Sequence, residues 1–273
     1  MPQIVRYISS ELLPYYEAAE ARALAWWVAE EITHKTQTEL ILLSDCKITE
    51  KNPYLQEILA RLRKKEPIQY IFGTTQWRGL NLKVNPATLI PRPETAELVD
   101  LILRENHSQA SVLDIGTGTG CIAIALKMAR PSWTITAIDK SHDALQVAIH
   151  NGEKHRVTIR WQEQDIFQKV PSNTEEQYDI VVSNPPYVHP SDETDESASH
   201  WEPQNAIFVP EKDPLCFYRQ IGSLRLGRTL YFEINENLAH ETAAMLEETN
   251  YTDIRIIKDS YGKDRFITCR LCP

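Results

Sequence analysis

Cysteine is scarce in this sequence and follows no pattern that would join the residues in pairs. The chain contains Cys46, Cys121, Cys216, Cys269 and Cys272, an odd and scattered set in 273 residues. Such a set is typical of reduced thiols rather than of a disulfide framework. Cys269 and Cys272 form a Cys-x-x-Cys, but no second pair accompanies them. Because zinc requires four ligands, we interpret these two as thiols at the end of a strand and expect no metal site.

Long apolar runs and an excess of basic residues are also missing. No segment reaches the roughly 20 apolar residues that span a bilayer, and the first residues lack the pattern of a signal peptide. The chain has 29 basic and 38 acidic residues, a net charge of −9. Because duplex binding depends on Lys and Arg neutralising phosphates, we expect no direct contact with nucleic acid. We also expect a cytoplasmic protein, attached to no membrane, and a monomer.

What is present changes in pattern along the chain, which is long enough for two domains. Residues 1–67 are predicted to be helical. Asn52 is a suitable N-cap and Pro53 suits the first helical position. Apolar residues then follow at the spacing of one helix face: Leu55, Ile58, Leu59 and Leu62. Residues 68–93 combine aromatic and β-branched residues around two glycines with several prolines, which predicts a β-hairpin and a stiff linker.

In residues 94–273, strands and helices alternate. This alternation predicts an α/β fold in which helices flank a parallel-rich sheet. The candidate strands are residues 111–115, 134–139, 157–164, 178–183, 230–234, 253–257 and 266–270. Periodicity alone does not give their order in the sheet.

A glycine-rich turn follows the first of these strands. It reads Gly116-Thr117-Gly118-Thr119-Gly120, and residues 121–128 are predicted to continue as a helix. Glycine has no Cβ and tolerates positive φ, so such a turn lets a cofactor approach the backbone closely. Asp139 ends the next strand, about 20 residues further on, where a carboxylate can accept hydrogen bonds from both ribose hydroxyls of a nucleoside cofactor.

The spacing of the glycines helps to distinguish between cofactors. The NAD fingerprint Gly-x-Gly-x-x-Gly would place its third glycine where Cys121 stands, and no Gly-Lys-Ser/Thr of a phosphate-binding loop is present. An acid, Asp114, stands shortly before the first glycine, which fits the methyltransferase form of the loop. The loop by itself therefore favours S-adenosylmethionine modestly over NAD.

The segment Asn184-Pro185-Pro186-Tyr187 follows the strand 178–183, at the edge where an open α/β sheet binds its ligands. The two prolines remove two N–H donors, so the carbonyls there act only as acceptors, and Asn184 adds a side-chain oxygen. Two acceptors suit a planar NH2 group, because they orient its nitrogen and take up positive charge as a methyl group arrives. Tyr187 can stack on that group. We therefore predict S-adenosylmethionine-dependent methylation of an amide or amino nitrogen.

These motifs resemble those of the HemK/PrmC family, which methylates a glutamine of class I peptide-chain release factors. The resemblance covers nearly the whole chain, at residues 66–73, 89–95, 114–120 and 184–187, at Glu202-Pro203, and at Tyr261-Gly262 with Asp264-Arg265. It implies a class I, Rossmann-like methyltransferase sheet of seven strands, the last antiparallel, in residues 94–273. A small all-helical N-terminal domain, residues 1–67, would bind the substrate protein, and residues 68–93 would form the linking hairpin.

The resemblance also implies a role for each motif. The residues that would contact S-adenosylmethionine are Gly116, Thr117, Gly118, Thr119, Gly120, Asp139, Asp165, Ile166 and Asn184. The residues that would hold the glutamine of a Gly-Gly-Gln motif are Asn184, Pro185, Pro186 and Tyr187, of which Asn184, Pro185 and Tyr187 would take part in catalysis. S-adenosylhomocysteine would be the second product. Arg228 and Asn235 stand where relatives commonly have glycine, and we expect these departures to lie away from the amide site.

Three alternatives stay open. Ribosomal-protein glutamine methyltransferases resemble the chain in both motifs, although residues 90–95 look more like the release-factor branch. DNA adenine methyltransferases share the Asn-Pro-Pro-Tyr chemistry, but the acidic charge and the lack of a basic target-recognition segment argue against them. A non-catalytic adaptor with the same fold is disfavoured by the intact glycine loop, Asp139 and Asn184.

A polar segment, residues 188–203, follows Asn-Pro-Pro-Tyr and is rich in Ser, Asp, Glu and Thr. Long loops at the ends of strands commonly serve as lids over active sites. We interpret this segment as a lid over the site, while a plain solvated loop is equally compatible with its composition.

Overall fold

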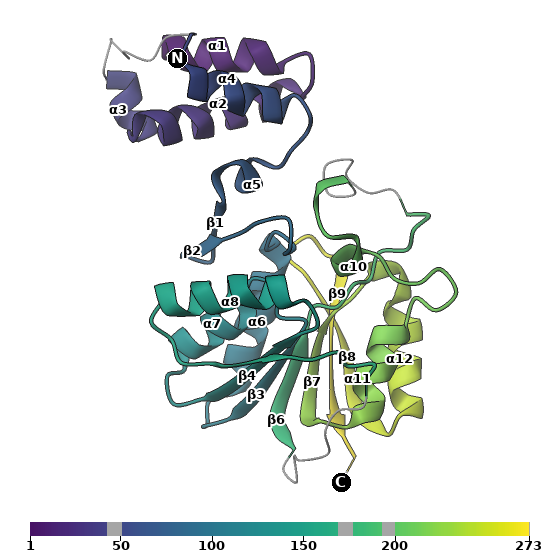
Figure 1. Cartoon of the computed structure of the whole chain (residues 1–273). Helices are drawn as coiled ribbons and strands as arrows, with labels where there is room; N and C mark the ends of the chain where they lie inside the picture. Colours follow the sequence, from purple (N-terminus) through teal and green to yellow (C-terminus); the bar gives the residue numbers. More distant parts are fainter. Residues whose placement is uncertain (43–50, 169–176, 193–199, 273) are drawn as a thin grey trace. The chain divides into compact units, whose positions relative to one another are not determined.

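The computed structural model describes residues 1–42, 51–168, 177–192 and 200–272. The chain divides into two compact units (Figure 1). Among the described residues, the first consists of residues up to 72 with 200 and 201, and the second of residues from 73 to 192 with 202–272. Each unit has a hydrophobic core of its own. No helix within the described ranges is long and apolar enough to cross a membrane.

The described part of the first unit is helical. Its helices are α1 (Gln3–Leu12), α2 (Ala18–Thr33), α3 (Gln37–Leu42), α4 (Pro53–Leu62) and α5 (Ile68–Phe72). Helix α4 begins as its sequence predicts, because the side-chain oxygen of Asn52 accepts a hydrogen bond from the N–H of Leu55 at 3.1 Å. The four apolar residues of its predicted face are all buried against α1 and α2: Leu55, Ile58, Leu59 and Leu62.

The predicted hairpin is present but begins later than residue 68. Residues 68–72 form α5 instead, because the N–H groups of Tyr70 and Ile71 turn back to the carbonyl of Pro67. The hairpin itself consists of β1 (Thr74–Trp77) and β2 (Leu80–Lys83), paired antiparallel. Arg78 and Gly79 connect the strands with φ of 48° and 75°. Positive φ at both central residues is characteristic of the type I′ turn, which commonly connects the strands of two-residue hairpins.

The second unit is built on a sheet of seven strands. These are β3 (Ser111–Ile115), β4 (Thr134–Asp139), β5 (Arg160–Glu163), β6 (Tyr178–Ser183), β7 (Gly227–Glu233), β8 (Tyr251–Lys258) and β9 (Asp264–Leu271). Their order is β5-β4-β3-β6-β7-β9-β8. The first five pair in parallel, and β9 runs antiparallel to β7 and β8. This arrangement confirms the predicted class I methyltransferase sheet.

The strand boundaries differ from the sequence pattern at several ends. The strand predicted at residues 157–164 is confined to Arg160–Glu163, because the N–H of Val157 instead closes the turn after a helix by donating to Gly152. Strands β7, β8 and β9 start before the predicted residues 230, 253 and 266. Their backbone pairing continues past the apolar residues that mark a strand in the sequence.

Helices cover both faces of the sheet (Figure 1). One face packs against α6 (Pro93–Glu105), α7 (Cys121–Ala129) and α8 (His142–Lys154), and the other against α11 (Cys216–Leu224) and α12 (Ala239–Glu248). Two short helices lie in connecting segments, α10 (Gln204–Ile207) and η1 (Glu236–Leu238). Successive strand residues point to opposite faces, so Val112 joins one core cluster and Leu113 the other. The carboxyl ends of the parallel strands remain uncovered by these helices and form the edge where a ligand can bind.

Gly227, the first residue of β7, gives a test of this packing. A Cβ at this position would lie 2.4 Å from Cγ2 of Val181, which is fully buried in the neighbouring β6. We predict that Gly227→Ala lowers the free energy of unfolding by about 1–3 kcal/mol, because the strand must shift or Val181 must leave its rotamer. Urea denaturation measures the change. Gly222→Ala in α11 is the matched control, since its Cβ would come no closer than 3.3 Å to any neighbour. A Gly227→Ala protein as stable as this control would contradict the packing.

Candidate active site

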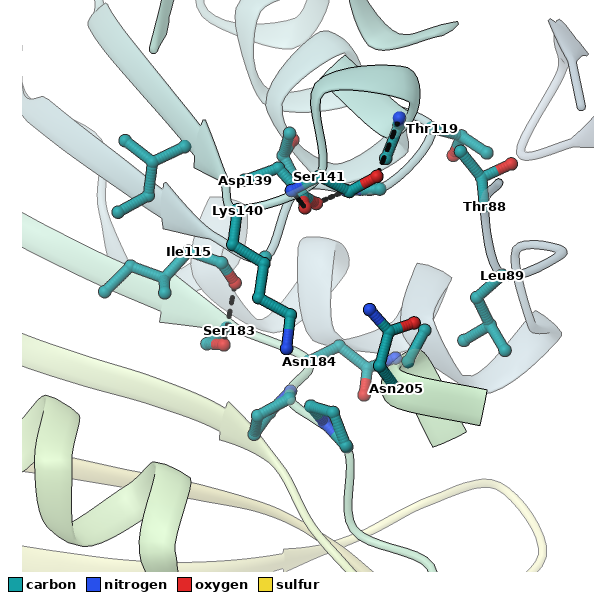
Figure 2. Close-up of a pocket in the computed structure, with 18 of the residues that line it drawn as sticks. Thr88, Leu89, Ile115, Thr119, Asp139, Lys140, Ser141, Ser183, Asn184 and Asn205 are labelled. Carbon is teal, nitrogen blue, oxygen red and sulfur yellow. Dashed lines mark hydrogen bonds between the residues drawn. The ribbon is translucent and has the colours of Figure 1, made fainter. Parts of the chain in front are cut away.

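A pocket lies at the carboxyl ends of β3, β4 and β6 (Figure 2). Residues predicted from separate motifs meet in its lining: Gly116, Thr117, Gly118, Thr119, Asp139, Asp165, Ile166, Asn184, Pro185 and Pro186. The fold brings them together because parallel strands all end at the same edge of a sheet. Other parts of the wall come from residues 87–89, 91 and 92 and from Asn205 and Ala206 of α10.

The glycine loop borders open space on its pocket side. Gly116 and Gly118 have φ of 71° and 55°, in the left-handed region that glycine adopts without strain. A Cβ at Gly116 would meet no atom within 4 Å, so a ligand can approach the backbone there. The N–H groups of Gly116 and Thr117 both donate to the carbonyl of Ile138, at 2.9 and 3.0 Å. The loop is therefore tied to the end of β4 and shaped before any ligand arrives.

Asp139 is the last residue of β4, and both of its carboxylate oxygens accept hydrogen bonds from backbone N–H groups. Oδ2 accepts from the N–H of Gly118 at 2.9 Å, and Oδ1 accepts from the N–H of Ser141 at 2.9 Å. Each carboxylate oxygen has a further lone pair, so both can also accept from a ligand. Burial raises the pKa of Asp139, and the hydrogen bonds from Ser141 and Gly118 oppose that shift. The carboxylate is thus held rigidly at the pocket wall with capacity for a pair of hydroxyl groups.

Gly120 has a different position from the other two glycines. It is buried, with φ of 80°, and is absent from the pocket lining among the described residues. A Cβ there would lie 3.1 Å from Trp161 and 3.2 Å from both Ala148 and Ile124. The glycine therefore allows α7 to pack closely against α8 and β5. Its predicted contact with S-adenosylmethionine stays a prediction.

Asp114 supports the loop from inside the sheet. It is fully buried in β3, and its Oδ2 accepts a hydrogen bond from Oγ1 of Thr117 at 2.6 Å. Burial raises the pKa of this carboxyl to about 7, while the bond from Thr117 opposes the shift. The acid before the glycines thus contributes to the shape of the loop.

The side-chain amide of Asn184 is held in one orientation by a hydrogen bond. Nδ2 donates to Oγ1 of Thr95 at 3.1 Å, in the first turn of α6. Because the NH2 group is engaged there, Oδ1 is the amide atom left to accept a hydrogen bond from a ligand. Pro185 and Pro186 continue the same wall without any N–H to donate. The site is therefore rich in acceptors, as the sequence predicts.

Tyr187 lies behind the pocket wall. Its hydroxyl donates to Oε1 of Glu233 at 3.0 Å, and its ring packs against the core cluster under α11. Burial, followed by the charge of Glu233, raises the pKa of Tyr187. Stacking of this ring on a substrate group stays a prediction.

The expectation that Asn235 lies away from the amide site is wrong. Its Nδ2 donates to the carbonyl of Tyr187 at 3.0 Å. The reason is topological: β6 and β7 are neighbours in the sheet, so the residues that follow them lie side by side. Asn235 therefore helps to hold the Asn-Pro-Pro-Tyr segment in place.

Sequence reasoning indicated Glu202 in a motif but missed its role in shaping the site. Glu202 is 4% exposed and accepts hydrogen bonds from the N–H of Ile90 at 3.0 Å and from the Arg92 guanidinium at 2.5 Å. It thereby fixes the segment whose Pro91 and Arg92 line the pocket. Glu202 stands in a motif that the sequence indicated, yet its partners are more than a hundred residues away, so their pairing has no local signal.

The predicted lid, residues 188–203, lies partly outside the described residues, at 193–199. At its described start, Val188 forms a parallel bridge with Phe208, beyond α10. Asn205 and Ala206 of α10 contribute to the pocket wall. Movement of the segment stays a prediction.

The cysteines whose positions the structure describes, Cys121, Cys216, Cys269 and Cys272, are free thiols, while Cys46 lies outside the described residues. Cys269 is buried in β9 and Cys272 follows the strand. In the described part of the chain, no group of three or more His, Cys, Asp or Glu side chains is placed to hold a metal ion.

Family models match both parts of the chain. The model of the PrmC N-terminal domain matches residues 3–73, which include the helical unit. The model of the Methyltransferase small domain matches residues 95–201, which include the glycine loop and Asn-Pro-Pro-Tyr.

Solved structures agree with the fold. The chain superposes on the hMettl16 catalytic domain bound to the MAT2A 3′UTR hairpin 1 with a TM-score of 0.57 and 14% identity, covering 81% of this chain and 92% of that one. A methyltransferase from Pyrococcus furiosus gives a TM-score of 0.51 and 16% identity, covering 79% and 98%. At such identities the likeness shows the fold alone.

Relatives of known name are similar over almost their whole length. The release factor glutamine methyltransferase of Bacteroides thetaiotaomicron is 42% identical, covering 98% of this chain and 99% of its own. The protein of the same name from Flavobacterium psychrophilum is 39% identical over 94% of each chain. That of Streptococcus pneumoniae is 34% identical over 98% of this chain and 97% of its own. The chain therefore belongs to the release factor glutamine methyltransferase family.

Proposed function

We propose that this protein transfers a methyl group from S-adenosylmethionine to the side-chain amide nitrogen of the glutamine in the Gly-Gly-Gln motif of class I peptide-chain release factors. The observation that carries the proposal is the meeting of the open glycine loop, Asp139 and Asn184 in one pocket. Membership of the family supports methyl transfer, and the names of its relatives support the release factor as substrate. The reaction would modulate translation termination in the cytoplasm.

The residues of the pocket fit the donor. Asp139 keeps lone pairs on both oxygens for the two ribose hydroxyls, and the bare backbone at Gly116 admits a ligand closely. Asp165 and Ile166 line the same pocket and would adjoin the adenine. When bound, S-adenosylmethionine supplies an electrophilic methyl group on its sulfonium and leaves as S-adenosylhomocysteine.

The chain itself positions the substrate nitrogen. An amide nitrogen is a poor nucleophile because its lone pair is delocalised into the carbonyl. Oδ1 of Asn184 and the backbone carbonyl of Pro185 would accept its two hydrogens and fix its direction. Such positioning can contribute about 7–11 kcal/mol to the lowering of a barrier. The same acceptors stabilise positive charge that develops on the nitrogen. A dedicated strong base is unnecessary, since the nitrogen becomes acidic as it is alkylated.

Substrate choice is tested by offering alternatives. The purified protein is incubated with labelled S-adenosylmethionine and, separately, with a release factor, ribosomal proteins or duplex DNA. We expect label in the release factor alone. A release factor in which the glutamine of Gly-Gly-Gln is replaced by alanine is the control and should stay unlabelled.

Each other outcome has a distinct meaning. Label in ribosomal protein or DNA, with none in the release factor, would retain the methyltransferase and overturn the substrate. Failure of the protein to bind S-adenosylmethionine would overturn the activity and favour a non-catalytic adaptor.

A further inference from the structure

Behind Asn184, hydrogen bonds run inward to a buried acid. Nδ2 of Asn184 donates to Oγ1 of Thr95 at 3.1 Å, and Oγ1 of Thr95 donates to Oε2 of Glu233 at 2.7 Å. Thr95 is 2% exposed and Glu233 is 0% exposed. The three residues come from the segment after β6, the first turn of α6 and the end of β7. The sheet and its helix therefore converge on the amide of Asn184.

The direction of these hydrogen bonds follows from the chemistry of Glu233. An ionised carboxylate only accepts, and a threonine hydroxyl has a single hydrogen. When the hydroxyl of Thr95 donates its hydrogen to Glu233, Oγ1 of Thr95 can only accept further hydrogen bonds. Asn184 must therefore turn its NH2 group toward Thr95. The reversed amide would set Oδ1 against the oxygen of Thr95 with no hydrogen between them. An ionised Glu233 thus selects the orientation in which Oδ1 is free for the substrate.

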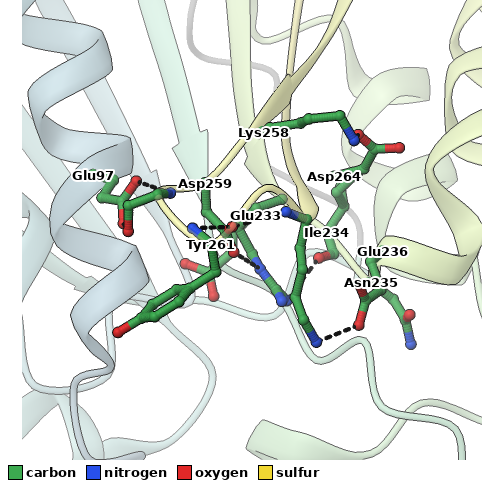
Figure 3. Close-up of polar contacts among 12 residues, drawn as sticks. Glu97, Glu233, Ile234, Asn235, Glu236, Lys258, Asp259, Tyr261 and Asp264 are labelled. Atoms are coloured by element: carbon green, nitrogen blue, oxygen red, sulfur yellow. Dashed lines mark hydrogen bonds and ion pairs between the residues drawn. The ribbon is translucent and has the colours of Figure 1, made fainter.

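The surroundings of Glu233 keep its second oxygen occupied. Oε1 accepts from the hydroxyl of Tyr187 at 3.0 Å. Figure 3 shows Glu233 beside Ile234 and Asn235, next to the turn that carries Asp259. Arg265, held by Asp259 at 3.2 Å, also donates to the carbonyl of Ile234. The acid therefore has a fixed position and a donor for each oxygen.

Titratable groups on several neighbouring elements interact electrostatically with Glu233. Burial raises its pKa to about 7, and the hydrogen bonds from Thr95 and Tyr187 oppose that shift. The titratable and charged groups that interact with it electrostatically are Glu94 of α6, Cys121 of α7, Tyr187, Tyr218 of α11 and Arg265 of β9. Glu94 raises the pKa further and Arg265 lowers it.

We propose that Thr95 and Glu233 are positioning residues that keep the amide oxygen of Asn184 turned toward the substrate nitrogen. The inference rests on the proposed function, methyl transfer to an amide nitrogen. It also explains a specificity. A fixed acceptor at this place holds the NH2 group of a glutamine and repels the carboxylate of a glutamate, which has no hydrogen to offer.

The variant Thr95→Val tests the hydrogen bonds that join Asn184, Thr95 and Glu233, because it keeps the branched shape of the side chain and removes the hydroxyl. We expect kcat for the release factor to fall about 10–100-fold, by analogy with the loss of hydrogen bonds that orient the ligands of metal sites. The affinity for S-adenosylhomocysteine, measured by calorimetry, should stay near that of the wild type, while the thermal unfolding midpoint should fall modestly because Val removes the donor to Oε2 of the buried Glu233. Thr95→Ser is the matched variant: it restores the hydroxyl and should recover most of the lost kcat.

The pH profile gives a readout that a merely structural role would not move. A protonated Glu233 can donate to Thr95, which frees the hydrogen of Thr95 for Oδ1 of Asn184 and lets the amide reverse. In the wild type, kcat should therefore fall as the pH drops below the Glu233 pKa of about 7. Glu233→Gln should have a lower kcat without this acidic limb. Asp114, whose pKa is also raised to about 7 by burial, remains in that variant, so a limb that survives would not belong to Glu233.

The inference and the proposed function fail in different ways. If the wild type methylates no release factor, the proposed function is wrong, and the inference that rests on it is wrong too. If the wild type is active and Thr95→Val matches its kcat, or if Glu233→Gln keeps the acidic limb, the positioning role is wrong. A Thr95→Val protein that loses donor affinity together with kcat, with neither recovered in Thr95→Ser, would show that Thr95 maintains the shape of the pocket instead.

Discussion

Replacing Asn184 with alanine should lower kcat for methyl transfer about 10²–10³-fold while leaving the binding of S-adenosylmethionine weakened but present. The substitution removes Oδ1, the acceptor that grips the NH2 group in our proposal. Loss of one preorganised hydrogen-bonding group of this kind typically costs about 10²–10³ in kcat. The donor keeps its contacts with the glycine loop and Asp139, which come from other strands. The expected effect therefore falls mainly on turnover.

Single-turnover kinetics with saturating donor measures this loss, and calorimetry with S-adenosylhomocysteine measures donor affinity. Asn237→Ala is a matched control, since it makes the same truncation at an exposed asparagine of η1. It should keep the activity of the wild type. An Asn184→Ala enzyme that turns over within a few-fold of this control would exclude Asn184 as the group that positions the substrate.

Asp139→Ala should act mainly on donor affinity, with an effect as large as that of Asn184→Ala on turnover. Hydrogen bonds to a charged group contribute about 1.5–3 kcal/mol each. Loss of two bonds to ribose hydroxyls therefore reduces affinity by roughly 10²–10⁴-fold. The backbone N–H groups of Gly118 and Ser141 also lose their acceptor, which loosens the glycine loop. Both consequences act on the donor and neither acts directly on the substrate amide.

Calorimetric titration with S-adenosylhomocysteine measures the affinity of this variant. Asp143→Ala, at an exposed acid in the first turn of α8, is the control for loss of one negative charge nearby. At donor concentrations high enough to saturate the variant, kcat should approach that of the wild type. Unchanged donor affinity in Asp139→Ala would remove Asp139 from the donor site.

Features that depend on neighbours in the sequence could be predicted from it. The cap and buried face of α4 need only the residues around Asn52, and the hairpin turn needs only Arg78 and Gly79. The glycine loop and Asn-Pro-Pro-Tyr were placed at strand ends from local pattern, and the fold then joins them in one pocket. The helix at residues 68–72 was missed because a short run of apolar residues has no clear period.

Contacts between distant residues could not be predicted in the same way. Thr95 and Glu233 are 138 positions apart, and the sequence gives no sign that they share a hydrogen bond. Nothing in the sequence shows that Trp161 packs against Gly120, whose predicted contact with the donor stays a prediction. Asn235 was expected away from the site because the sequence does not show that β7 lies next to β6. In each case the missing information is how the strands and helices are arranged in space.

The most direct test of the account is to map the methyl group after a reaction. A release factor is incubated with the enzyme and S-adenosylmethionine, digested and sequenced by tandem mass spectrometry. The account predicts a single methyl group on the side-chain amide nitrogen of the glutamine in Gly-Gly-Gln, with a far smaller yield in the same reaction time when Asn184→Ala replaces the wild type. A methyl group on another residue, or none with a wild type that binds the donor, would contradict it.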